Sequence, residues 1–142
     1  MRVPGKLIWI VILIVMLTAL LYPYETTVVP QWTVRAVDEA GSPLGKVAVT
    51  EYWRHTSVES GDHHAESITD DKGYVTFPRR TIRASLLRRV IGPLINRLNV
   101  HGVDLGPHAY LIVAGDMNST THNSDYLPGK PLPQQIVLSR LR

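Results

Sequence analysis

The stretch that decides the fold is residues 66–78, ESITDDKGYVTFP, in which two short runs flank the turn 70–73, DDKG. Gly73 can supply the positive φ that a short hairpin with a bulge requires, and aspartates favour such turns. In the second run, Val75 and Phe77 alternate with polar residues, so both face one side of a strand. The stretch therefore predicts a β-hairpin with Val75 and Phe77 in the core.

Short segments of alternating or continuous apolar residues predict further strands. Residues 32–36 alternate Trp32, Val34 and Ala36 with polar residues and end at a turn rich in Asp, Gly and Pro. We expect further strands at 46–56, 109–114 and 135–141, and irregular structure at 57–65 and 115–133. Because strands dominate, the sequence predicts a mainly β fold, a β-sandwich over residues 32–142.

The order of strands and turns in residues 33–80 resembles the carboxypeptidase regulatory-like modules. The residues that carry the resemblance are Thr33 to Asp38, Gly41-Ser42-Pro43-Leu44, Lys46 to Val49 and Thr69 to Pro78. These modules belong to the transthyretin-like (prealbumin-like) sandwiches. The resemblance implies a small non-catalytic sandwich with a structural, adhesive or regulatory role, and it brings no site residues with it.

The pattern changes to a helical period after Ser85. Seven apolar residues recur at helical spacing: Leu86, Leu87, Val90, Ile91, Leu94, Ile95 and Leu98. The sequence predicts one amphipathic helical insertion at 85–98, kinked or broken at Gly92-Pro93. We expect its apolar stripe to pack on the sheet.

The same region carries charge of a single sign. Between Lys72 and Val103 there is no acidic residue, whereas six arginines fall there. Such a segment can lie on anionic headgroups or dock on the acidic surface of a partner, and the alternative is a solvated face. If it is an interaction surface, Arg88, Arg89 and Arg97 are the expected contact residues.

The N-terminal segment 7–22 is almost entirely apolar. No charge occurs between Lys6 and Glu25, and eighteen uncharged residues would span about 27 Å. We expect a single transmembrane anchor at 7–22, with a cytoplasmic stub at 1–6 and an extended linker at 23–31. The alternatives are a cleaved signal peptide, for which Leu17 is a poor cleavage-site residue, and a buried helix.

This charge placement puts the chain in the cytoplasmic (inner) membrane, single-pass, with residues 32–142 periplasmic or extracellular. The chain has no cysteine, which excludes disulfides and thiolate chemistry. Without Arg2 and Lys6, 13 basic residues face 12 acidic ones. That near-neutral balance gives no reason to expect a nucleic-acid partner.

Histidines offer the one weak sign of metal chemistry. His63 and His64, with Asp62 beside them, could bind a transition metal and serve a small metal-dependent hydrolase. Adjacent histidines on a strand point to opposite faces, however, and no paired His spacing is present. We therefore expect no catalytic residues, no metal and no cofactor.

These observations favour a non-enzymatic, membrane-anchored extracytoplasmic interaction or structural module, with a metal-dependent hydrolase as the alternative. Its expected partners are the membrane, through residues 7–22, and a protein or other envelope component. The chain could also be a subunit of a larger envelope complex. Contacts would come from exposed strand edges and from the arginine-bearing helix.

Overall fold

The computed structural model describes residues 5–59, 61–98, 106–115, 119–122 and 124–140, with the side chains of 95–98 and 122 outside that description. Two helices and ten strands lie within these ranges. In chain order they are α1 (Gly5–Leu21), β1 (Pro23–Val29), β2 (Trp32–Asp38), β3 (Ala48–His55), β4 (His63–Ile68), β5 (Tyr74–Phe77), β6 (Arg80–Ser85), α2 (Leu86–Leu98), β7 (Pro107–Val113), β8 (Ser119–His122), β9 (Asp125–Tyr126) and β10 (Gln135–Arg140).

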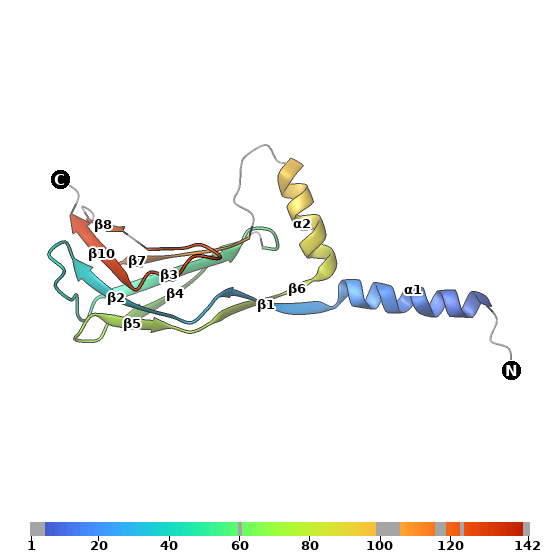
Figure 1. Ribbon diagram of the computed structural model, residues 1–142, viewed down its shortest axis with the longest axis horizontal. Coiled ribbons are helices and arrows are strands. Elements are labelled where there is room, and N and C mark those ends of the chain that lie inside the picture. The colour runs from blue at the N-terminus through green and yellow to red at the C-terminus, as the bar shows by residue number, and fades with distance from the viewer. Residues whose placement is uncertain (1–4, 60, 99–105, 116–118, 123, 141–142) are drawn as a thin grey trace.

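The strands form two four-stranded sheets and one two-stranded ribbon. One sheet has the order β5-β2-β10-β8 and the other β4-β3-β7-β9, while β1 pairs with β6. All pairs are antiparallel except β2 with β10. We call the two four-stranded sheets the β body. The ribbon leads from this body to α1 and α2 at one end of the molecule (Figure 1).

Side chains from both sheets meet in one core. Trp32 and Phe77 lie opposite each other on β2 and β5, and Leu111 of β7 comes from the other sheet; all three are buried. The indole Nε1 of Trp32 donates a hydrogen bond to the carbonyl of Pro133 at 2.8 Å, so its one polar atom is satisfied. The expectation of a mainly β fold is confirmed, and the arrangement is consistent with a β-sandwich.

The turn at 70–73 is formed as expected, but the strands on its two sides do not pair. Asp70 Oδ1 accepts hydrogen bonds from the N–H groups of Lys72 (2.9 Å) and Tyr74 (2.8 Å). Gly73 has φ 82°, and a Cβ there would lie 2.7 Å from the carbonyl oxygen of Ala36. Beyond the turn, β4 pairs with β3 and β5 pairs with β2. The turn thus connects the two sheets, because packing of Phe77 on the core sets the pairing.

Residues 23–31 are not a linker. Most of them form β1, which pairs with β6 from Pro23 opposite Ser85 onward. Val28 and Val29 are buried in the core. The prolines at 23 and 30 suggested an unpaired segment, but β-branched residues between them favour a strand. The ribbon therefore holds α1 to the body by paired backbone.

The predicted transmembrane anchor at 7–22 and the single-pass inner-membrane location are wrong. The expected cytoplasmic stub at 1–6 falls mostly on residues 1–4, which lie outside the described residues. In the described part of the chain, no helix has the length and apolar character needed to cross a membrane. Helix α1 has 17 residues, which span about 26 Å against a hydrocarbon layer of about 30 Å. The apolar segment ends as a helix at Leu21, because the chain turns at once into β1.

The predicted helix at 85–98 is confirmed as α2. Ser85 caps it, since its Oγ accepts a hydrogen bond from the backbone N–H of Arg88 at 3.3 Å. The expected break at Gly92-Pro93 does not divide it, for α2 is one helix through Pro93. Strand β6 follows β5 closely, and Pro78 lies between the two.

Candidate functional site: the helical lobe

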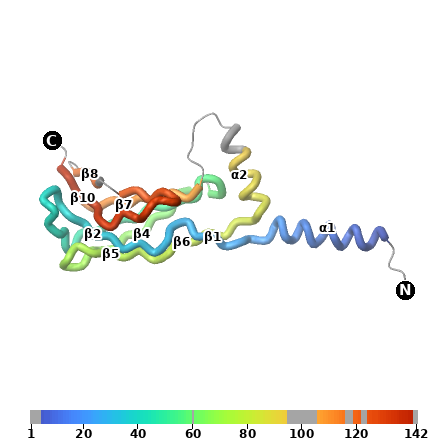
Figure 2. The backbone as a smooth tube through the Cα atoms, viewed as in Figure 1, coloured from blue at the N-terminus to red at the C-terminus, as the bar shows by residue number. Residues whose placement is uncertain are grey.

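We call α1, α2 and the outer end of the β1–β6 ribbon the helical lobe. It lies at the opposite end of the molecule from the last strand, and α1 extends away from the body (Figure 2). Helices α1 and α2 contact each other, and α2 also contacts β6. The lobe therefore touches the body mainly through the ribbon and one side of α2.

Gly92 determines which side of α2 faces the body. A Cβ at Gly92 would overlap the backbone carbonyl of Ser57, in the loop between β3 and β4. Only glycine allows this approach, which explains why a helix-weakening residue occurs in the middle of α2. Arg89 lies on the same side: its Nη2 donates to the carbonyl of Tyr24 at 2.8 Å and its Nε to that of Ala84 at 3.3 Å.

The apolar stripe of α2 consequently points away from the body. Because an α-helix turns by about 100° per residue, Val90 and Leu94 lie opposite the side that carries Arg89 and Gly92. Their side chains are 65% and 62% exposed, and Leu86, Leu87 and Ile91 are exposed as well. The expectation that this stripe packs on the sheet is wrong. The smallest residue of the helix lies on its polar side, so that side makes the close contact.

Helix α1 adds a second apolar surface to the lobe. Its large apolar side chains from Leu7 to Leu17 are all exposed, and none of its residues is buried. At its end, the rings of Tyr22 and Tyr24 meet edge to face, with centroids 5.2 Å apart, and both are exposed. The lobe thus presents apolar side chains on both helices and amphipathic aromatic residues where α1 joins the ribbon.

The three arginines named from the sequence have different environments. Arg88 is exposed, whereas Arg89 is half-buried and holds α2 to the ribbon. Arg97 lies in α2, but its side chain is outside the described residues. Arg83, which the sequence did not single out, is exposed on β6 and lies 3.7 Å from Glu25. Among the described side chains, Arg88 and Arg83 are therefore the exposed cationic groups near the stripe.

A buried ion pair fixes the ribbon to the body. Arg80 of β6 donates to Glu51 Oε2 at 2.8 Å from both Nε and Nη2, and the side chain of Glu51 is 0% exposed. The guanidinium also lies over the Trp53 ring, 4.2 Å from its centroid. Glu51 Oε1 has no hydrogen-bond partner among the described residues. Burial raises the pKa of the Glu51 carboxyl, although Arg80 opposes the shift.

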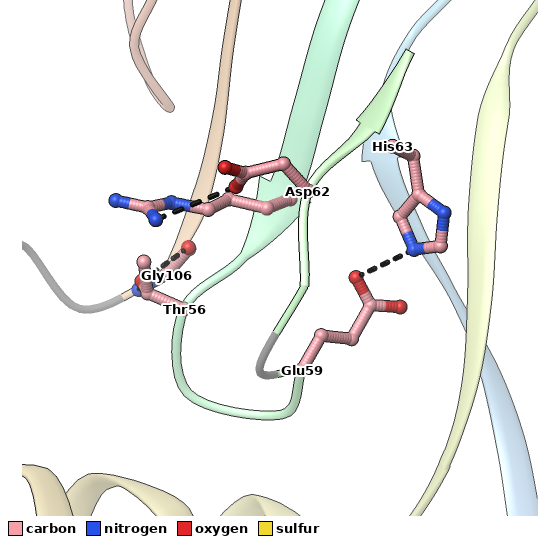
Figure 3. Close-up of polar contacts among 6 residues, drawn as sticks. Thr56, Glu59, Asp62, His63 and Gly106 are labelled. Carbon is pink, nitrogen blue, oxygen red and sulfur yellow. Dashed lines mark hydrogen bonds and ion pairs between the residues drawn. The ribbon is translucent and has the colours of Figure 1, made fainter.

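Asp62, His63 and His64 do not converge on one point. Asp62 lies 3.4 Å from Arg54, while His63 Nε2 lies 3.2 Å from Glu59. Figure 3 shows Asp62 and His63 pointing away from each other at the start of β4. The His63 ring stacks on Trp53 and the His64 ring lies by Tyr52, which are neighbours on β3 and so face opposite sides of the sheet.

No group of three or more His, Asp or Glu side chains that could hold a metal ion occurs in the described ranges. One cavity, of about 480 Å³ at the far end of the body, is also a poor candidate. It is lined by Asp38, Glu39 and Arg140, among others. Both carboxylates already accept backbone N–H bonds, Asp38 from Ser42 and Glu39 from Arg140. The helical lobe is therefore the strongest candidate site.

Sequence reasoning missed the direction of the apolar stripe and the role of Arg80. The signal for the first was present, because a glycine on the polar side of an amphipathic helix marks a close backbone approach on that side. No local signal identified Arg80, since its partner Glu51 lies 29 residues earlier on another strand. Comparison of the chain with protein-family models, with curated proteins and with solved structures found no match.

Proposed function

We propose that this protein is a non-enzymatic interaction module, a transthyretin-like sandwich that binds its partner through the helical lobe. The observation that carries the proposal is the outward direction of the α2 stripe. A helix that packs on its own domain normally buries its apolar side. Here the contact at Gly92 uses the polar side instead, so the apolar side is left for another molecule.

Leaving the apolar stripe of α2 in water costs free energy. Full burial of one large apolar side chain contributes about 1.5–3 kcal/mol. Five such side chains are exposed on α2 between Leu86 and Leu94, and α1, which contacts α2, exposes further apolar side chains. Contiguous apolar surface of this kind marks a site of interaction.

The sandwich type is supported by the way the motif residues fit together. The Oγ1 of Thr69 donates to the carbonyl of Leu44 at 2.7 Å and accepts from the N–H of Val47 at 3.0 Å. The N–H of Ala36 donates to the carbonyl of Gly73 at 2.8 Å. The pattern that resembles the carboxypeptidase regulatory-like modules has an earlier part, at 33–49, and a later part, at 69–78. Hydrogen bonds thus join these two parts to each other.

The metal-dependent hydrolase has no comparable support. Asp62, His63 and His64 each have a different neighbour, namely Arg54, Glu59 with Trp53, and Tyr52. A His63/His64 double alanine variant separates the two functions. The interaction module should keep its binding in this variant, whereas a hydrolase would lose bound metal and activity together.

Site-specific photo-crosslinking in cells tests the proposed function. A photoreactive side chain replaces Val90 on α2, and a matched control replaces Ile68 on β4; both native residues are 65% exposed. If the lobe is a contact surface, crosslinked adducts should form at Val90, and few should form at Ile68. Equal yields at both positions, or none at Val90, would contradict it.

A further inference from the structure

This inference rests on the proposed function, in which the lobe is the contact surface. The chemistry of the lobe then indicates what kind of partner covers it. Helix α1 is apolar on every side, and none of its residues is buried by the rest of the chain. A protein partner normally meets a surface that combines an apolar centre with a polar rim and hydrogen bonds. The sides of α1 from Leu7 to Leu17 offer no such rim.

Charge around the α2 stripe favours an anionic partner surface. Arg88 follows Leu87 on the helix, and Arg83 is 74% exposed on the neighbouring strand. No acidic residue occurs between Lys72 and Val103 to neutralise this side. Glu25 is the acidic group that the structure records near Arg83, at 3.7 Å. A second copy of the chain has the same arginines and no acidic residue between Lys72 and Val103 to face them, so repulsion of like charges disfavours self-association through this side.

Tyr22 and Tyr24 fit the same partner. Tyrosine rings gather where an apolar layer meets water, because the ring is apolar and the hydroxyl is polar. Both rings are exposed at the junction of α1 and β1, close to the ribbon end from which α2 starts, since Pro23 pairs with Ser85. Apolar helix, tyrosines, outward stripe and arginines therefore lie at one end of the molecule.

We infer that α2 lies on the surface of a lipid bilayer that contains anionic lipids. Its stripe contacts the acyl chains, while Arg83 and Arg88 contact the lipid phosphates. The long arginine side chains can reach the headgroups from beside an inserted stripe. The apolar side chains of α1 contact the same lipid. The Gly92 contact with Ser57 then holds the β body against the polar side of α2, away from the acyl chains.

The test uses the full chain and a fluorophore at Val90→Cys, a unique attachment site because the chain has no cysteine. Vesicles of phosphatidylcholine, with or without phosphatidylglycerol, carry a quencher on their acyl chains. We expect quenching at Val90 with phosphatidylglycerol vesicles, and none at the matched control Ile68→Cys. Quenching should weaken at high salt, because exposed charges are screened.

Charge variants test whether Arg83 and Arg88 contribute to the binding of anionic lipid. Each arginine near an anionic surface strengthens binding about fivefold. The variant R83Q/R88Q should therefore weaken binding of the chain to phosphatidylglycerol vesicles, followed by quenching at Val90→Cys, about 25-fold. The control Lys130→Gln, an exposed lysine on the body, should change nothing. Equal quenching with and without phosphatidylglycerol, or no effect of R83Q/R88Q, would overturn the anionic-lipid proposal.

Two outcomes separate this proposal from the proposed function. Protein adducts at Val90 in cells, without quenching by any vesicle, would overturn lipid binding and leave the lobe as a contact surface. Protection of Val90 by unlabelled chain in the absence of vesicles would instead identify a second copy as the occupant, which also overturns the lipid proposal.

Discussion

The β body and the helical lobe place their apolar side chains in opposite directions. The body buries its apolar side chains, such as Trp32 and Phe77, and directs its polar residues outward. The lobe directs Val90 and Leu94 outward and uses Gly92 and Arg89 for its contact with the body. The difference shows that the amphipathic pattern of a segment identifies its apolar side, whereas the smallest residue identifies the side that packs.

The two regions also differ in how far their charged side chains are buried. Where the ribbon meets the body, Arg80 and Glu51 form an ion pair that water hardly reaches. On the lobe, Arg83 and Arg88 are exposed. A buried charge acts on the stability of the chain, and an exposed charge acts on its association with other molecules. Variants in the two regions should therefore change different measurements.

The largest effect is expected in the core of the body. Trp32→Ala removes a side chain that is 0% exposed, which should lower the free energy of unfolding by about 3–5 kcal/mol. The matched lobe variant Leu94→Ala should change it by less than about 0.5 kcal/mol. Urea unfolding followed by far-ultraviolet circular dichroism measures both. Equal losses would mean that the stripe packs on the chain after all.

The ion pair between ribbon and body should give the next largest effect. Arg80→Met leaves the buried Glu51 carboxylate without its partner, which should cost about 3 kcal/mol. The double variant E51M/R80M should recover most of this loss, because an apolar pair of similar volume removes both charges. A double variant as unstable as the single one would mean that Arg80 acts through its contact with Trp53 instead.

A smaller, local effect is expected at Gly92. Gly92→Ala places a methyl group against the carbonyl of Ser57, which should weaken the contact of α2 with the body by about 1–3 kcal/mol. Hydrogen exchange of the α2 amides should speed up, while that of β2 and β3 stays the same. The control Gly61→Ala, with nothing within 4 Å of the added Cβ, should leave exchange unchanged.

Much of the body could be predicted from the sequence, because the signals are local. The turn at 70–73 follows from Asp70 and Gly73, and β2 follows from the alternation of Trp32, Val34 and Ala36 with polar residues. The pairing of β5 with β2 could not be predicted, because it depends on Trp32 and Phe77 meeting across more than forty residues. Strands β8 and β9 were missed because both are short, and each depends on its pairing with β10 or β7.

The lobe was harder to predict than the body. Its helices are local features, yet the length of α1 depends on where β1 begins, and β1 is fixed by its pairing with β6. The direction of the α2 stripe depends on the contact between Gly92 and Ser57. The candidate residues Asp62, His63 and His64 could be placed on one segment, but their divergence depends on β4 being a strand.

The smallest predicted effects are two opposite pH dependences within the body. Burial raises the pKa of Glu51 above 4.5, so the folded state binds this proton more tightly than the unfolded state. Its contribution to stability is fully present below 4.5 and is lost as the pH rises through the folded value. Acidification from neutral pH toward 4.5 should therefore stabilise the chain through Glu51. Urea unfolding across this range should show that Glu51→Gln removes the gain.

His55 should act in the opposite direction. Burial, and after it the nearby Arg89 guanidinium, lower the pKa of His55 below 6.5, although other contacts oppose the shift. The contribution of His55 is fully present above pH 6.5 and is lost as the pH falls through the lowered folded value. His55→Leu should remove this loss in the same unfolding series. A variant with the wild-type slope would mean that His55 does not titrate differently in the two states.

The central claim is that α2 faces the body with its polar side, and disulfide formation tests it most directly. The full chain, which has no cysteine of its own, receives Ser57→Cys together with either Pro93→Cys or Leu94→Cys. Pro93 is half-buried beside Gly92, whereas Leu94 belongs to the exposed stripe. If the polar side of α2 faces the body, oxidation should link Ser57→Cys to Pro93→Cys and leave Leu94→Cys free. A link to Leu94→Cys, with none to Pro93→Cys, would contradict it.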